Sequence, residues 1–166
     1  MAVSGVRTLS RMRTAGEFQT RSVEETRAWG ARLAQLLQPG DVIALDGPLG
    51  AGKTHLVQGI LQGLDFPREH VTSPTFTLIQ EYPARIAVCH CDAYRLRDVD
   101  EFLELGVDEL LGSAVICLIE WAERVAEALP RDRLSIGLQV SGETARIIKI
   151  GASGPRSEQI LQQLLD

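Results

Sequence analysis

Eight consecutive residues, Gly47 to Thr54 (GPLGAGKT), match the pattern G-x-x-x-x-G-K-[ST]. Glycines in such a pattern let the backbone turn so that successive N–H groups face phosphate oxygens. Lys53 can reach the β- and γ-phosphates of a nucleotide, and the Thr54 hydroxyl can bind Mg²⁺. A helix beginning near Lys53 would add the positive end of its dipole. The motif therefore predicts a phosphate site, and a chance glycine-rich turn between a strand and a helix is the alternative.

Two acidic residues stand at the ends of predicted strands and could serve that site. Glu120 follows the apolar run at residues 114–119 (AVICLI), and Asp92 follows residues 85–91 (RIAVCHC). Ligands of open parallel sheets collect at the carboxyl ends of the strands, so we expect Glu120 to approach a bound metal. An ordinary surface carboxylate is the alternative. Asp92 reaches that edge only if its strand is parallel to the others, and the residues leave this open.

The segments beside the motif are those that could hold it in place. Residues 41–46 (DVIALD) are short, apolar and β-branched, which is typical of a buried parallel strand, and residues 53–64 have helical periodicity. A further helix is predicted after Ser22, a good N-cap, and its pattern ends at Pro39-Gly40. The motif is specific mainly because it lies between a buried strand and an amphipathic helix.

The rest of the chain predicts hairpins and short helices. Hairpins are expected from residues 75–82 with 85–91, and from 134–140 with 145–150 around Ser141-Gly142; helical segments are expected at 98–105, 108–111, 121–129 and from 157. This pattern predicts an α/β fold of the P-loop NTPase type, with a central mixed sheet, parallel core strands, antiparallel hairpins and helices on both faces. We expect one domain over residues 17–166, with a short edge strand at 17–21, and a disordered tail over 1–16.

Composition limits the function. The chain has 166 residues, 45% of them hydrophobic, with a net charge of −5, which favours one globular domain and disfavours a broad surface for nucleic acid. Contact with RNA is therefore expected only through a partner. No long apolar run or secretory signal is present, and three cysteines fit a reducing compartment, so we expect a cytoplasmic protein. Cys89 and Cys91 should face one side of their strand and His90 the other, so no single ion could bind all three.

Four motifs in order resemble one known family. GPLGAGKT, VTSPTF (71–76), HCDAYRL (90–96) and IEWAE (119–123) are similar to those of the bacterial TsaE-type P-loop ATPases of tRNA N6-threonylcarbamoyladenosine biosynthesis. The resemblance extends from about Phe18 to Ile150. It implies a P-loop fold, Mg²⁺-dependent ATP hydrolysis, and work beside the threonylcarbamoyl-transferase complex of TsaD/TsaB-type proteins, which modifies adenosine 37 of tRNA. The sequence offers no convincing internal arginine to complete the phosphate site, so we expect hydrolysis to be weak in isolation and stimulated by the partner complex.

The resemblance also implies roles for individual residues. Thr54 and Glu120 would hold Mg²⁺, and Asp92 would be a functional acid, so that Lys53, Asp92 and Glu120 form the catalytic group. The segment at 22–24 would approach the nucleotide, and the loop at 72–76 would be the switch-like segment of the family. The phosphates of ATP or ADP would be wrapped by Leu49, Gly50, Ala51, Gly52, Lys53 and Thr54, with Gly142 nearby. His55 and Cys91 depart from the residues usual in the family, but neither removes a group that the phosphates need.

Two other functions remain open on the sequence. One is a nucleotide-gated binding module in which hydrolysis is incidental. The other is a small-molecule P-loop kinase, although no segment is long enough for the arginine-bearing lid that a kinase usually needs. Trp121 could pack on the nucleotide or lie half-buried in the core. His55 is expected to pack or to face solvent.

Overall fold

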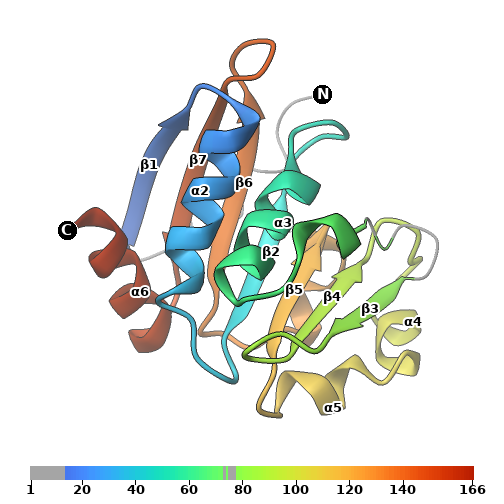
Figure 1. Ribbon diagram of the computed structural model, residues 1–166. Helices are drawn as coiled ribbons and strands as arrows, with labels where there is room; N and C mark the ends of the chain where they lie inside the picture. Colours follow the sequence, from blue (N-terminus) through green and yellow to red (C-terminus); the bar gives the residue numbers. More distant parts are fainter. Residues whose placement is uncertain (1–13, 73, 75–77) are drawn as a thin grey trace.

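A mixed sheet of seven strands runs through the centre of the computed structural model, which describes residues 14–72, 74 and 78–166 (Figure 1). The strand order is β1-β7-β6-β2-β5-β4-β3. Strands β6, β2, β5 and β4 are mutually parallel, while β1, β7 and β3 pair antiparallel. The strands are β1 (Thr14–Thr20), β2 (Val42–Asp46), β3 (Ile79–Tyr82), β4 (Val88–Asp92), β5 (Ile116–Glu120), β6 (Leu134–Val140) and β7 (Arg146–Ala152). The predicted mixed sheet with a parallel core is confirmed.

Helices cover both faces of this sheet, as predicted. One face packs against α2 (Val23–Ala34), α3 (Lys53–Gly63) and α6 (Pro155–Leu165); the other packs against α4 (Val99–Glu104), α5 (Val107–Leu111) and η2 (Ala122–Ala128); η1 (Arg68–His70) follows α3. Alternate side chains of β2 pack into two separate hydrophobic cores, Ile43 into the core on the α3 face and Ala44 into the core on the η2 face. None of the helices in the described ranges is long and apolar enough to cross a membrane.

Local signals in the sequence set most helix ends. The Ser22 hydroxyl accepts a hydrogen bond from the Glu25 N–H at 3.1 Å, as an N-cap should. Asp98 does the same for α4, accepting from the Glu101 N–H at 2.9 Å. Gly106, which follows that helix, has φ +79°, a left-handed conformation that glycine adopts without steric cost.

Close contact between α2 and α3 sets the position of the helix that follows the glycine motif. A Cβ atom at Gly59 of α3 would lie 2.2 Å from the backbone oxygen of Arg27 in α2, so only glycine allows this approach. The Arg27 guanidinium also donates to the Gln58 side-chain oxygen at 3.1 and 3.0 Å. The N-terminus of α3 is therefore held by a helix contact as well as by the sheet.

Three predictions of local structure need correction. Strand β1 begins at Thr14, which pairs with Ala152, so residues 14–16 belong to the sheet and not to a tail. The seven-residue partner β7 sets the length of β1, and no local pattern reveals this. Residues 122–128 form a 3-10 helix with a break at Val125, where an ordinary helix was expected. In the first hairpin, β3 begins at Ile79 with Leu78 outside it, and β4 begins at Val88, three residues later than predicted. Residues 1–13, 73 and 75–77, which include the start of that predicted hairpin, lie outside the described residues.

Candidate nucleotide-binding site

The glycine motif forms a tight loop between β2 and α3, as predicted. Gly47, Gly50 and Gly52 have φ values of +154°, +80° and +100°, conformations that side-chain-bearing residues rarely adopt. Ala51 is buried, and its N–H donates to the Pro48 oxygen at 3.0 Å, closing a turn inside the loop. Helix α3 begins directly at Lys53. The loop therefore has the strand–turn–helix context that a phosphate cradle requires.

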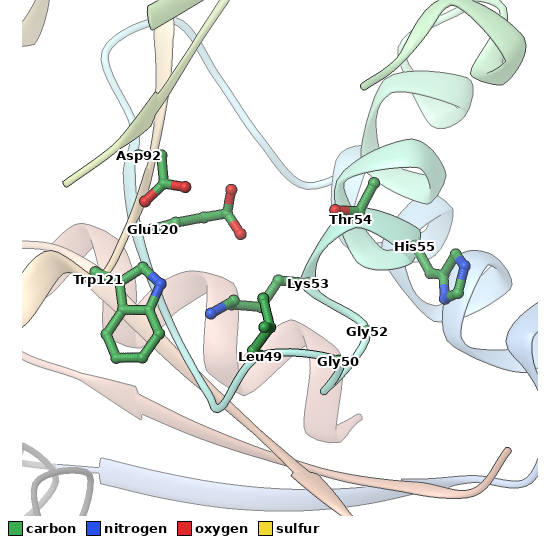
Figure 2. A pocket seen from close by; sticks show the side chains of 9 residues that line it. All are labelled: Leu49, Gly50, Gly52, Lys53, Thr54, His55, Asp92, Glu120 and Trp121. Carbon is green, nitrogen blue, oxygen red and sulfur yellow. The ribbon is translucent and has the colours of Figure 1, made fainter. Parts of the chain in front are cut away.

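The carboxyl ends of β2, β4 and β5 meet beside this loop. Strand β4 is parallel to β5, and Asp92 is the register partner of Glu120, so both acids lie at the same edge of the sheet. The sequence had left the position of Asp92 open, and the direction of β4 settles it. A pocket of about 250 Å³ opens here, lined by Leu49, Gly50, Gly52, Lys53, Thr54, His55, Asp92, Glu120 and Trp121 (Figure 2).

Glu120 is held in place by a buried histidine. His90 Nε2 lies 2.8 Å from Glu120 Oε2, and the histidine side chain is fully buried. Because a carboxylate can only accept, the histidine N–H donates in this bond. Figure 2 shows the Glu120 carboxylate between Asp92 and Thr54, pointing into the pocket. Sequence reasoning placed His90 opposite the two cysteines, which is confirmed, but it missed this contact with Glu120.

Lys53 points into the same space and is the counter-charge of both acids. Its Nζ donates to the Gly47 oxygen at 2.6 Å and lies 4.3 Å from the centroid of the Trp121 ring. Burial lowers the pKa of Lys53, and the nearby carboxylates of Glu120 and Asp92 oppose that change. The ammonium group is therefore partly desolvated, and a charge-assisted hydrogen bond from it to a phosphate oxygen would be stronger here than in water.

Asp92 and Trp121 are fixed by backbone hydrogen bonds. Asp92 Oδ1 accepts from the Tyr94 N–H at 2.9 Å. Trp121 has φ +56°, and its N–H donates to the Leu45 oxygen at 3.0 Å. Its ring packs 5.0 Å from that of Tyr94, centroid to centroid, and also lines the pocket. Trp121 is thus half-buried, as one expectation had it, and it also lines the pocket.

Several residues expected at the nucleotide do not line the pocket, namely Ala51, Gly142, residues 22–24 and, from the segment 72–76, the described Thr72 and Pro74. The Ala51 side chain is buried in the core, so only its backbone can contribute. Gly142 lies in the turn between β6 and β7, and its oxygen accepts from Arg146 Nη1 at 3.3 Å. His55 does line the pocket, but Figure 2 shows its ring on the side away from the two acids.

The oxygen donors of the pocket suit Mg²⁺ with a nucleotide. The Thr54 hydroxyl and the carboxylates of Glu120 and Asp92 are hard oxygen ligands, which this ion prefers. Within the described ranges, no three His, Cys, Asp or Glu side chains are grouped so that they could hold a metal. Mg²⁺ in nucleotide sites usually takes one or two carboxylates and completes its shell with phosphate oxygens and water. The donor set therefore fits a metal that arrives with phosphate.

A phosphate loop between a parallel strand and a helix, with acids at the ends of adjacent strands, defines the class of P-loop nucleotide-binding proteins. The family model described as "Threonylcarbamoyl adenosine biosynthesis protein TsaE" matches residues 20–148, and the chain belongs to this TsaE family. The family expected from the four motifs is thereby confirmed.

Individual relatives agree with this assignment. The chain is 40% identical to the tRNA threonylcarbamoyladenosine biosynthesis protein TsaE of Bacillus subtilis over 149 residues, which is 89% of the chain and 92% of that protein. It is 40% identical to the TsaE of Treponema pallidum over 131 residues, covering 79% of the chain and 96% of the relative. Among solved structures, YdiB of Bacillus subtilis is similar with a TM-score of 0.78 and 35% identity, over 92% of this chain and 95% of that one.

Proposed function

We propose that the protein binds ATP together with Mg²⁺ in this pocket and hydrolyses it in support of tRNA threonylcarbamoyladenosine (t6A) modification. The family to which the chain belongs is one of t6A biosynthesis. The observation that carries the proposal is the convergence of Lys53 and Thr54 from α3 with Asp92 and Glu120 from two parallel strands on one pocket. A role in tRNA modification also agrees with the cytoplasmic location expected from the sequence.

The loop and α3 would bind the nucleotide. Backbone N–H groups of the loop, the first turn of α3 and the Lys53 ammonium group all offer hydrogen bonds to phosphate oxygens. Thr54 and Glu120 would hold Mg²⁺, which neutralises charge on the phosphates when it is bound. Glu120 suits this role because its hydrogen bond to His90 leaves the side chain with one orientation.

Asp92 would orient the attacking water. Its Oδ1 is fixed by the Tyr94 N–H, and the carboxylate lies beside Glu120 at the pocket wall. A carboxylate in this position can accept a hydrogen bond from a water molecule and align it with the phosphate. We therefore propose that Glu120 binds the metal and that Asp92 positions the attacking water.

The catalytic set would be completed from outside the chain. Phosphoryl transfer needs positive charge beyond the cradle, often from an arginine, and no arginine is among the described residues that line the pocket. We therefore propose that TsaD/TsaB-type subunits of the threonylcarbamoyl-transferase complex stimulate hydrolysis. Contact with tRNA would be indirect, in keeping with the net charge of −5.

Titration with a fluorescent ADP analogue tests the binding site. Lys53→Ala should weaken binding by at least about a hundredfold, because it removes the main side-chain charge facing the β-phosphate. The chain offers a matched control, since Lys149 in β7 is its other lysine. Lys149→Ala should bind normally. Unchanged affinity in a folded Lys53→Ala variant would mean that the loop is not the phosphate site.

Phosphate release distinguishes the proposed ATPase from the two alternatives. Incubation with ATP and Mg²⁺ should release inorganic phosphate without forming any phosphorylated small molecule, which a kinase would form. A binding module would support tRNA modification even in a hydrolysis-dead variant. Thr54→Ala should weaken Mg²⁺-dependent ATP binding more than metal-free ADP binding, and Thr54→Ser should restore it by returning the hydroxyl group.

A further inference from the structure

Arg146, the first residue of β7, reaches back to the outer side of the phosphate loop. Its Nε donates to the Ala51 oxygen at 2.8 Å, and its Nη2 donates to the Gly50 oxygen at 3.3 Å. Its Nη1 donates to the oxygens of Ala145, at 2.8 Å, and Gly142, at 3.3 Å. One guanidinium group therefore joins four backbone oxygens, two in the phosphate loop and two in the turn between β6 and β7.

The tip of the phosphate loop has few other neighbours. Leu49 is 95% exposed, and a Cβ atom at Gly50 would have no neighbour within 4 Å. Glycine-rich backbone of this kind has many conformations, and each must be restricted before the N–H groups can face a phosphate together. A rigid fork of donors on the carbonyl side restricts them without occupying the pocket.

The contact with Ala51 also sets the direction of a donor. The carbonyl of Ala51 and the N–H of Gly52 belong to the same planar trans peptide group and point in opposite directions. Arg146 binds the carbonyl from outside, and Gly52 lines the pocket on the other side. Holding the Ala51 oxygen outward therefore holds the Gly52 N–H toward the position of the phosphate.

The other end of this connection is itself anchored. Arg146 is the register partner of Val140 where β6 and β7 leave the turn. In the same turn the Thr144 hydroxyl donates to the Arg21 oxygen at 3.0 Å, directly before the N-cap of α2. The guanidinium group thus joins the glycine-rich phosphate loop to a turn that is itself held by β6, β7 and the residue before the N-cap of α2.

We propose that Arg146 is a positioning residue for the phosphate loop, acting as a clamp that preorganises its N–H groups for nucleotide. This inference rests on the proposed function, because it assumes that the loop binds phosphate. It assigns Arg146 a role through backbone geometry and not through direct contact with the ligand. A positive charge at this position is then not enough to hold the phosphate loop, because the loop and the turn are joined by the several N–H donors of the planar guanidinium group.

Affinity for a fluorescent ADP analogue without Mg²⁺, and for inorganic pyrophosphate in competition, tests the clamp. Arg146→Gln should weaken both by about tenfold or more, which corresponds to the loss of charge-assisted hydrogen bonds. Arg146→Lys keeps the charge but cannot span two segments, so it should recover only a small part of the affinity. Full recovery by lysine would overturn the clamp in favour of simple charge attraction.

A second arginine provides the matched control. Arg156 also holds the fold through a backbone oxygen, that of Leu36, and through Asp41, but it lies in α6 away from the pocket. Arg156→Gln should lower the melting temperature and leave ADP affinity unchanged. Arg146→Gln should lower ADP affinity by about tenfold or more and change the melting temperature less than Arg156→Gln does. In ATP turnover, Arg146→Gln should raise KM more than it lowers kcat.

The outcomes separate this proposal from the proposed function. Normal ADP and pyrophosphate affinity in Arg146→Gln, with tight binding by the wild type and loss in Lys53→Ala, would overturn the clamp alone. An equal loss of affinity in the Arg146 and Arg156 variants would also overturn it, since it would indicate general destabilisation. A wild-type protein that bound neither ligand would overturn the proposed function and the clamp together.

Discussion

At the scale of single residues, three charged side chains that line the pocket are almost fully buried. Lys53, Asp92 and Glu120 are only 7%, 5% and 3% exposed. Buried charges are tolerated when they are paired, and removing one member leaves the others uncompensated. Substitutions that keep the shape but remove charge are therefore the informative ones here, because they separate chemistry from packing.

Glu120→Gln should retain nucleotide binding and lose hydrolysis by about a hundredfold or more, since the amide is a poor metal ligand in place of a carboxylate. ADP titration and phosphate release, each with and without the transferase partner, measure the two effects. Near-normal partner-stimulated hydrolysis in Glu120→Gln would remove this residue from the metal site.

Asp92→Asn should also spare ADP affinity and reduce turnover. Near-normal partner-stimulated hydrolysis in Asp92→Asn would mean that Asp92 has a structural role and not a catalytic one.

Asp46, the last residue of β2, should make stability depend on pH. Burial, and after it the neighbouring Glu123 carboxylate, raises the pKa of Asp46 from 3.8 to about 6, although Lys53 and Arg133 oppose the change. The folded state then binds the proton more tightly than the unfolded state. The resulting stability is fully present below pH 3.8 and is lost as the pH rises through about 6.

Urea unfolding at several pH values measures this effect. Between pH 4 and pH 7.5 the wild type should lose roughly 2.4 kcal/mol that Asp46→Asn does not lose, because each tenfold change in proton affinity is worth about 1.4 kcal/mol and the unfolded-state carboxyl is already partly ionised at pH 4. The exposed Asp108 serves as a control, and Asp108→Asn should follow the wild type. Parallel curves for wild type and Asp46→Asn would show that the Asp46 carboxylate is well solvated.

At the scale of secondary structure elements, the packing of α3 against α2 sets the position of the first residues of α3, where the phosphate loop ends. Gly59→Ala should destabilise the protein by about 1–3 kcal/mol, even though alanine favours helices, because the new methyl group meets the Arg27 backbone and cannot be accommodated by a side-chain rotation. Thermal or urea unfolding measures the loss.

A second glycine gives the comparison. A Cβ atom at Gly112, after α5, meets nothing within 4 Å, so Gly112→Ala should change stability by less than about 0.5 kcal/mol. If the two alanine variants were equally stable, the helices would have room to separate. In that case α2 would not be what positions α3 and its first residues Lys53 and Thr54.

At the scale of the whole molecule, the pocket has the parts for binding phosphate but lacks an arginine among its described lining residues. The isolated protein should therefore hydrolyse ATP more slowly than about 1 per second, the low end for typical enzymes. Adding TsaD/TsaB-type subunits should raise the rate, and a phosphate-release assay at fixed ATP measures it. Fast turnover that is indifferent to these subunits would contradict an external contribution.

The amino-acid sequence alone determined the features that depend on neighbouring residues. The phosphate loop is one run of eight residues, so its glycines, lysine and threonine could be interpreted without knowing the fold. The caps at Ser22 and Asp98 are equally local, because a cap bonds to a backbone group three residues away. Short apolar runs likewise predicted the buried strands, and the two-residue period of a strand predicted opposite faces for Cys89 and His90.

Only the tertiary structure decided which distant groups meet. The alternation in β4 is satisfied by either strand direction, and it is the parallel register against β5 that brings Asp92 beside Glu120 and His90 within reach of it. Arg146 contacts Ala51 across 95 residues of sequence, and Thr14 joins the sheet because β7 extends far enough to pair with it. Such contacts arise from how the whole sheet and its helices pack, and local residue preferences carry no information about them.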